Sequence, residues 1–180
     1  MKDFVFLGLG SNLDNRLWYI VQALRHLDNS PNIQIDKMSS VYETEPYGIK
    51  EQRNFLNAVV QIQTHFRPAK LLQCVKFIER KLGRIHRSKW HSREIDIDIL
   101  AYGQEETNLS WLTIPHSDLQ NRRFVLVPFD EIAPQFELIE PRKKICSLVQ
   151  TCPDRGEVRL IIPAEELHIQ FDPSAEKVLA

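Results

Sequence analysis

Residues Lys89–Leu100 read Lys-Trp-His-Ser-Arg-Glu-Ile-Asp-Ile-Asp-Ile-Leu and join a basic, aromatic loop to a predicted strand. From Glu94 to Ile99 acidic residues and isoleucine alternate strictly, which is the period of a half-buried strand. The isoleucines are therefore expected on the core, and Glu94, Asp96 and Asp98 on the opposite face. Carboxylates two residues apart on one face lie about 6.5–7 Å apart at the backbone. This spacing suits two carboxylates that converge on hard cations shared with phosphate oxygens.

A dense run of positive charge precedes the acidic face. Within 14 residues that contain no Asp or Glu, six are basic: Arg80, Lys81, Arg84, Arg87, Lys89 and Arg93. Cations that face a pair of acids are what a nucleoside triphosphate with Mg²⁺ requires. Asp is also disfavoured in strands, so two on one face need a reason. The alternative is that these acids lie on the solvent-exposed face of an ordinary amphipathic strand. For an Asp-x-Asp motif that occurs alone this would be the favoured interpretation, because short motifs recur by accident.

The composition is that of one globular domain. The chain has 180 residues, of which 43% are hydrophobic and 26% charged. This length and this hydrophobic fraction are sufficient for one domain with a hydrophobic core. Its formal net charge of −1 argues against a general binder of nucleic acids or membrane surfaces. The three cysteines include no Cys-x-x-Cys, and the apolar run near the N-terminus is too short for a signal peptide. We therefore expect free thiols and a cytoplasmic protein.

Strands and helices alternate irregularly along the chain. Strands are predicted over residues 4–8, 33–42, 54–64, 94–99, 111–114 and 157–162, and helices up to about residue 28 and over 68–82 and 144–151. Ser11 or Asn12 is expected to cap the first helix. Pro128, Pro134 and Pro141 are expected to break their region into turns, and the tail from Pro163 to be weakly structured. A parallel doubly wound sheet would need a helix at nearly every crossover, so a mainly antiparallel α+β fold is favoured.

Asn57 is an unusual residue in the third predicted strand, where it lies between Phe55 and Val59 on one face. A buried Asn must satisfy both ends of its amide. An internal hydrogen bond to a neighbouring loop and a contact with the donor and acceptor edge of a ligand are equally good interpretations.

Eight short motifs occur in one order over about residues 4–162. They are Gly10-Ser11-Asn12-Leu13, Ser39-Ser40-Val41-Tyr42-Glu43-Thr44-Glu45-Pro46, Asn54-Phe55-Leu56-Asn57-Ala58, Leu82-Gly83-Arg84, Trp90 with Arg93, Asp96-Ile97-Asp98-Ile99-Leu100, Pro115-His116, and Asn121-Arg122-Arg123-Phe124. This ordered set resembles the 6-hydroxymethyl-7,8-dihydropterin pyrophosphokinase (2-amino-4-hydroxy-6-hydroxymethyldihydropteridine diphosphokinase) family.

The resemblance implies a fold and a reaction. The fold is ferredoxin-like α+β, a mainly antiparallel sheet with helices packed on both faces. A single pyrophosphokinase domain would cover residues 1–162, and residues 163–180 would form a C-terminal tail. In the reaction, which belongs to folate biosynthesis, the pyrophosphoryl group of ATP moves to the hydroxymethyl oxygen of 6-hydroxymethyl-7,8-dihydropterin and AMP leaves.

The resemblance also implies where ATP and metal bind. Asp96 and Asp98 would hold two Mg²⁺ ions on the triphosphate and, with Arg84 and Arg93, form the catalytic set. The ATP contacts would be Glu79, Arg84, Lys89, Arg93, Thr113, His116 and Arg122.

For the pterin, the resemblance implies that Phe55 and Phe124 enclose the flat ring and that Asn57 binds its edge. Trp90 would lie on a loop that closes over the site. Further contacts would come from Thr44, Glu45, Pro46 and Tyr47. Without the resemblance, the two phenylalanines would be interpreted as core aromatics.

The chain departs from the family pattern in the basic loop, where His91 and Ser92 replace a Gly-Pro turn and Lys89 replaces an arginine. One alternative function is another two-metal phosphoryl or nucleotidyl transferase. Another is a ferredoxin-like binding module without catalysis, which leaves the acidic pair beside a basic loop unexplained. We expect only small-molecule substrates, no nucleic-acid or membrane partner, and a monomer.

Overall fold

The computed structural model describes residues 3–85, 87 and 91–171. Within this part of the chain one six-stranded antiparallel sheet has the order β5-β1-β4-β3-β8, and β2 also pairs with β4. A separate two-stranded sheet consists of β6 and β7. The strands are β1 (Asp3–Ser11), β2 (Ile33–Met38), β3 (Val41–Thr44), β4 (Phe55–Thr64), β5 (Asp96–Tyr102), β6 (Thr107–Leu109), β7 (Leu112–Ile114) and β8 (Val158–Ile162).

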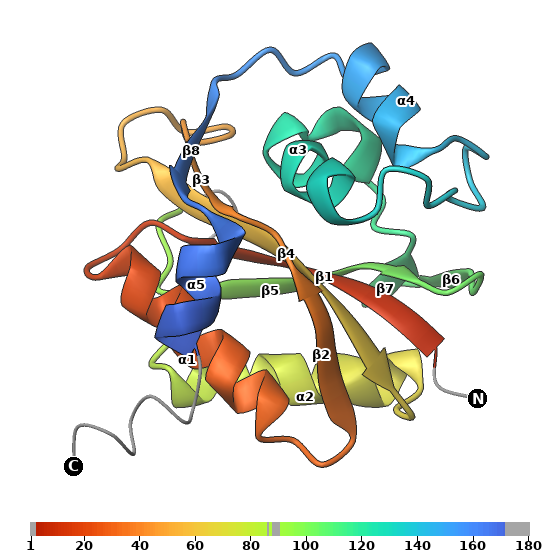
Figure 1. Ribbon diagram of the computed structural model, residues 1–180, viewed down its shortest axis with the longest axis horizontal. Helices are drawn as coiled ribbons and strands as arrows, with labels where there is room; N and C mark the ends of the chain where they lie inside the picture. The colour runs from red at the N-terminus through yellow and green to blue at the C-terminus, as the bar shows by residue number, and fades with distance from the viewer. Residues whose placement is uncertain (1–2, 86, 88–90, 172–180) are drawn as a thin grey trace.

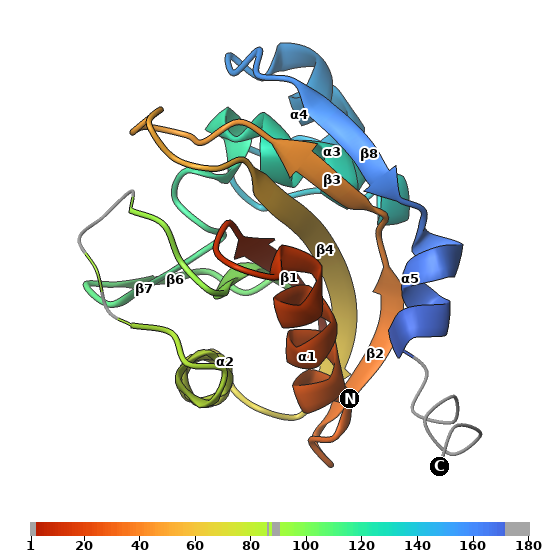
Figure 2. The same ribbon diagram turned by 90° about the vertical axis from the view of Figure 1, so that its left-hand side faces the viewer.

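Helices cover both faces of the large sheet (Figures 1 and 2). On one face lie α1 (Arg16–Asp28), α2 (Pro68–Lys81) and α5 (Ala164–Phe171). On the other face lie α3 (Arg123–Ile132) and α4 (Ile145–Thr151), which follow the 3₁₀ turn η1 (Leu119–Asn121). This arrangement confirms the predicted α+β fold with helices on both sides.

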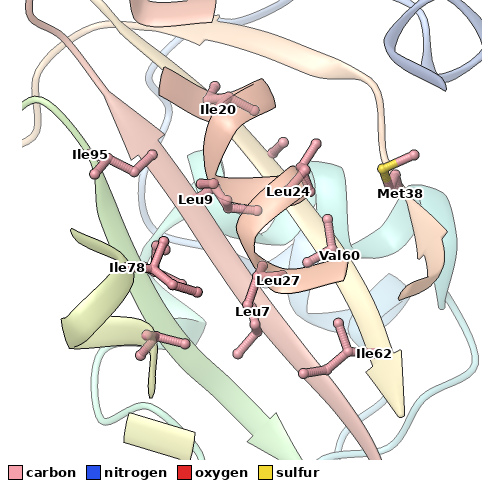
Figure 3. Close-up of a cluster of buried hydrophobic side chains, with 14 of the residues drawn as sticks. Leu7, Leu9, Ile20, Leu24, Leu27, Met38, Val60, Ile62, Ile78 and Ile95 are labelled. Carbon is pink, nitrogen blue, oxygen red and sulfur yellow. The ribbon is translucent and has the colours of Figure 1, made fainter. Parts of the chain in front are cut away.

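The alternation of β1 divides the core into two clusters. Leu7 and Leu9 point toward α1, where Leu24 and Leu27 lie against them (Figure 3). Phe6 points to the other side and joins the cluster under α3 and α4, with its ring centroid 4.4 Å from that of Phe129. β1 is therefore packed on both faces, and it pairs with β4 on one side and with β5 on the other.

The register of the central strands places residues from three strands in one row. Gly10 of β1 pairs with Asn57 of β4 on one side and with Asp96 of β5 on the other. Directly opposite residues in an antiparallel pair point to the same face. Gly8, two residues away on that face, pairs with Asp98. The predicted metal ligands and the predicted pterin contact therefore flank one glycine-containing strand.

Two local predictions near the first helices are wrong. The strand predicted over residues 33–42 is interrupted at Ser39–Ser40, because Glu131 of α3 accepts hydrogen bonds from the backbone nitrogen of Ser40 at 2.9 Å and from its hydroxyl at 2.7 Å. The N-cap of α1 is Asn15, whose side chain accepts from the backbone nitrogen of Trp18 at 3.1 Å. Ser11 still belongs to β1, which is longer than predicted.

Two helices lie where the sequence predicted turns or weak structure. Pro128 lies inside α3 and is itself buried. The helix forms because Leu126 and Phe129 are completely buried, and such packing overrides an unfavourable local propensity. In the tail, Ala164–Phe171 form α5, with Leu167 and Phe171 in the core beside α1. The assignment of residues 1–162 to a single catalytic domain stays a prediction.

If α5 is part of the folded unit, Leu167→Ala should lower the free energy of unfolding by about 2–5 kcal/mol, because it leaves a cavity in the core. The matched control is Ile169→Ala on the same helix, where the side chain is 70% exposed. Urea unfolding of both variants measures the difference. Equal effects would contradict the packing of α5 on the core.

Candidate functional site

A cavity of about 300 Å³ lies over the row that contains Gly10. Its lining comes from the central strands, from α2 and α3, and from the loops between them. The lining residues are Gly8, Leu9, Gly10, Thr44, Glu45, Tyr47, Phe55, Asn57, Ala58, Val59, Lys76, Arg84, Arg93, Asp96, Asp98, Leu100, His116, Arg122, Phe124 and Val125.

The glycines of β1 make the floor of this cavity possible. A Cβ atom on residue 10 would lie 3.1 Å from Oδ1 of Asn57 and 3.9 Å from Cδ1 of Phe55. A Cβ atom on residue 8 would lie 3.2 Å from a methyl group of Leu100. Side chains at either position would therefore displace residues that line the cavity or would fill it.

The acidic pair of β5 is surrounded by positive charge. The guanidinium groups of Arg84 and Arg93 both donate hydrogen bonds to Asp96. The ammonium group of Lys76 lies 3.8 Å from Oδ1 of Asp96 and 3.9 Å from Oδ1 of Asp98. This side of the cavity thus brings two carboxylates and three cations together.

The two carboxyl groups differ in their ionisation. Burial raises the pKa of Asp96, but the charges of Lys76, Arg93 and Arg84 outweigh it and hold that pKa well below its usual range. For Asp98, burial and the neighbouring charge of Asp96 raise the pKa above its usual value. A bound cation would therefore find Asp96 already ionised and would favour ionisation of Asp98.

Glu79 of α2 supports this cluster of carboxylates and cations. Its side chain is 4% exposed and accepts hydrogen bonds from the ammonium of Lys76 at 2.8 Å and from the backbone nitrogen of Ile97 at 2.7 Å. It also forms an ion pair with Arg84. Glu79 does not line the cavity, so the structure gives it a supporting place, and a direct ATP contact by Glu79 stays a prediction.

The described part of the basic loop is fixed to the start of β5. Arg87 donates two hydrogen bonds to Glu94, at 2.9 and 2.7 Å. Glu94 is buried and precedes β5, so the expectation that it shares the face of Asp96 and Asp98 is wrong. The bidentate contact with Arg87 fixes the carboxylate of Glu94, which therefore does not take the position that strand alternation predicted.

Asn12 connects this loop to the loop before β4. Its Oδ1 accepts from the backbone nitrogen of Arg93 at 2.8 Å, and its Nδ2 lies 3.2 Å from Oγ of Ser92 and from Oε1 of Gln52. The hydroxyl of Ser92 donates to the same Oε1 at 2.9 Å. Ser92, where the chain departs from the family pattern, thus takes part in the bonds that place Arg93.

The other half of the cavity is aromatic. Phe55 and Phe124 both line it, and the ring centroid of Phe124 lies 5.8 Å from that of Tyr47. Asn57 is 6% exposed, and its Nδ2 donates to Oγ1 of Thr44 at 2.7 Å. The amide thus has an internal hydrogen bond, as one interpretation predicted, but to the neighbouring strand β3 and not to a loop, and Asn57 also lines the cavity.

A third group of residues follows the cis peptide bond Ile114–Pro115. His116 and Arg122 line the cavity, and Asp118 positions both. Its carboxylate accepts from Nε of Arg122 at 2.9 Å, and its backbone nitrogen donates to Nδ1 of His116 at 3.2 Å. Burial lowers the pKa of His116, and the charge of Asp98 only partly opposes this effect. The imidazole is therefore favoured in its neutral form near pH 7.

The structure brings most of the predicted site residues into one cavity. Of the predicted residues that it describes, Pro46, Glu79 and Thr113 lie outside the lining; Pro46 lines a small hollow next to it, and Thr113 is in β7. Lys89 and Trp90 fall outside the described residues. Lys76 was missed by sequence reasoning, although its spacing of three residues from Glu79 could have indicated an ion pair on one face of α2.

The residues fit a magnesium ion that is shared with phosphate. Two carboxylates supply the hard oxygen ligands that Mg²⁺ prefers, and this ion usually takes only one or two carboxylates beside substrate phosphates and water. Among the described residues, no group of three or more His, Cys, Asp or Glu side chains could hold a metal ion alone. Likewise, no described helix has the length and apolarity needed to cross a membrane.

The fold and the cavity define a class of protein, an α+β domain whose cavity holds clustered carboxylates and cations beside aromatic rings. The chain belongs to the 7,8-dihydro-6-hydroxymethylpterin-pyrophosphokinase (HPPK) family, whose model matches residues 6–134. It is 43% identical to 2-amino-4-hydroxy-6-hydroxymethyldihydropteridine pyrophosphokinase of Aquifex aeolicus over 130 residues, 72% of this chain and 80% of the relative. The protein of the same name from Haemophilus influenzae is 37% identical over 156 residues, 86% of this chain and 96% of the relative.

A solved structure shares the fold at low sequence identity. Wild-type HPPK-DHPS of Plasmodium falciparum superimposes with a TM-score of 0.66 at 16% identity. The match covers 84% of this chain and 45% of the longer one, so the chain spans less than half the length of that protein.

Glu94→Gln should destabilise the protein at neutral pH. Hydrogen bonding by Arg87 lowers the pKa of Glu94 from its ordinary value of 4.5, against the effect of burial. A lowered pKa in the folded state stabilises above the unfolded value and loses this effect as the pH falls through the folded value. The difference in unfolding midpoint between wild type and variant should therefore be largest near pH 7 and shrink below about pH 4.5. Glu105→Gln, at an exposed position, is the control, and a difference that stays constant with pH would contradict the role of the ion pair.

Proposed function

We propose that the cavity binds ATP and the pterin side by side, with Asp96 and Asp98 holding two Mg²⁺ ions between them. The chain is a pterin pyrophosphokinase: it transfers the pyrophosphoryl group of ATP to the hydroxymethyl oxygen of 6-hydroxymethyl-7,8-dihydropterin and releases AMP, in folate biosynthesis. The observation that carries the assignment of the site is the row of Asp96, Gly10 and Asn57, which joins the charged half to the aromatic half.

The charged half suits a triphosphate. Transfer of a phosphoryl-type group asks the protein mainly for positioning and for neutralisation of charge. Arg84 and Arg93 would contact the phosphates, since both line the cavity beside Asp96. Arg122 and the neutral His116, which also line the cavity, would contact ATP as well. Mg²⁺, when bound, would supply charge neutralisation and lower the pKa of the attacking hydroxyl.

The aromatic half suits a flat heterocycle. Phe55 and Phe124 would enclose the pterin ring, because aromatic faces favour stacking on a planar ring. Asn57 would bind the edge of the ring with its amide, which offers both a donor and an acceptor. The segment Thr44–Tyr47, which follows from the end of β3, would close this side. Lys89, Trp90 and Thr113 also remain proposed contacts.

Three further statements belong to this proposal. We infer that the substrates are small molecules, with no nucleic-acid or membrane partner. We infer a monomer in the cytoplasm. The single catalytic domain over residues 1–162 is inferred from the ordered motifs, and α5 packs on its core.

The reaction is tested by identifying the nucleotide product. The protein is incubated with ATP, Mg²⁺ and 6-hydroxymethyl-7,8-dihydropterin, and nucleotides are separated by chromatography. AMP in an amount equal to the pterin diphosphate is the expected result. ADP would mean transfer of a single phosphoryl group, and no nucleotide turnover would refute the assignment.

The metal ligands are tested by Asp96→Ala and Asp98→Ala. Each variant should lose essentially all turnover while its circular dichroism spectrum stays that of the wild type, because both carboxylates line the cavity and neither belongs to the hydrophobic core. The control is Asp28→Ala, at an exposed position at the end of α1. Near-native turnover by either cavity variant would show that the assigned metal roles are wrong.

A further inference from the structure

Lys76 holds an unusual place in the site. It extends from α2, and its ammonium faces both carboxylates of the acidic pair, at 3.8 Å from Asp96 and 3.9 Å from Asp98. The described contacts of Arg84 and Arg93 with this pair are made to Asp96. A lysine of the protein thus faces both carboxylates that are proposed to hold the divalent cations.

The place of Lys76 is set by buried groups rather than by the acidic pair. Its ammonium donates to Glu79 at 2.8 Å and to the backbone carbonyl of Ile97 at 3.2 Å. Glu79 is 4% exposed and is bound in turn by the backbone nitrogen of Ile97. An ammonium has three donors, so two are used by this buried support and the third is available to the cavity. A cation that enters the site therefore meets a positive charge that is held in place by Glu79 and by the carbonyl of Ile97.

We propose that Lys76 is a built-in counter-cation of the Asp96–Asp98 pair that disfavours free divalent metal and favours metal that arrives with a polyphosphate. Like charges this close oppose one another, so Lys76 weakens the binding of Mg²⁺ alone. The negative charges of a triphosphate offset both the ammonium and the metal, which removes that repulsion. This inference rests on the proposed metal role of the pair and adds to it a preference for the metal–nucleotide complex.

The test compares metal binding with and without nucleotide. Mn²⁺ replaces Mg²⁺ so that free metal is measured by electron paramagnetic resonance. The nucleotide is an ATP analogue with a methylene group between the α- and β-phosphorus atoms, which cannot transfer its pyrophosphoryl group. Wild type is compared with Lys76→Gln, which removes the charge, and with Lys76→Arg, which keeps it. Lys70→Gln makes the same change of charge at an exposed position of α2.

Lys76→Gln should bind Mn²⁺ alone about tenfold or more tightly than wild type, the order of effect expected for a unit charge within 4–6 Å. With the analogue present, the affinity of this variant for Mn²⁺ should stay the same or fall, so the preference for metal with nucleotide shrinks about tenfold or more. Lys76→Arg and Lys70→Gln should behave as wild type. A variant that is merely damaged would lose affinity in both conditions.

The inference is overturned if Lys76→Gln takes up no more Mn²⁺ than wild type at every concentration of the metal-only titration. Asp98→Asn separates this result from a failure of the proposed site. If Asp98→Asn weakens Mn²⁺ binding while Lys76→Gln changes nothing, the metal site stands and the role of Lys76 is wrong. If Asp98→Asn also changes nothing, the pair is not the metal site, and the inference fails with it.

Discussion

The pairing of β1 between β4 and β5 is the constraint on which the site depends. Antiparallel register places Asn57, Gly10 and Asp96 in one row across three strands, with Gly8 and Asp98 two residues further along. Because strands lie about 4.8 Å apart, this row joins the amide on β4 to the carboxylate on β5 across the width of two strand spacings. Glycine at the centre leaves room above the row, and a shift of one residue in the pairing of β4 or of β5 would turn Asn57 or Asp96 to the opposite face.

The second requirement is a balance of charge around Asp96. Two arginines and Lys76 neutralise a carboxylate that would otherwise be costly to bring beside Asp98. The buried Glu79 orders two of these cations and also bonds to the backbone of β5. Charged groups held in this way need little rearrangement when a charged substrate binds, which is how an enzyme favours a transition state by preorganisation. The network belongs to the fold as much as to the chemistry, since it joins α2 to the edge strand of the sheet.

Different parts of the site were accessible to sequence reasoning to different degrees. Asp96 and Asp98 were predictable, because strict alternation with isoleucine determines which face a strand residue occupies. Phe55 and Phe124 gained meaning only from the order of motifs, since a lone aromatic residue is more often part of a core. Asn57 stood out as a polar residue among apolar ones, but its chemistry alone left an internal hydrogen bond and a ligand contact equally good. Lys76 was not found, because a lysine on the polar face of a helix looks the same whether it faces solvent or a neighbouring carboxylate. The misplaced features have similar causes: Pro128 and α5 depend on packing that local propensity does not contain.

Periodicity and ordered motifs can be recognised along the chain without any coordinates. They were enough to predict the α+β class, the strand that carries the acidic pair, and membership of a pyrophosphokinase family. The contacts of Glu94 with Arg87, of the buried Glu79 with the backbone of Ile97, and of Lys76 with both carboxylates became visible only in the folded molecule. These outcomes depend on which groups meet across elements, and such meetings are set by register and by helix packing. Ion pairs and close approaches at β1 are therefore properties of the folded molecule, where distances of a few ångströms decide which charge neutralises which.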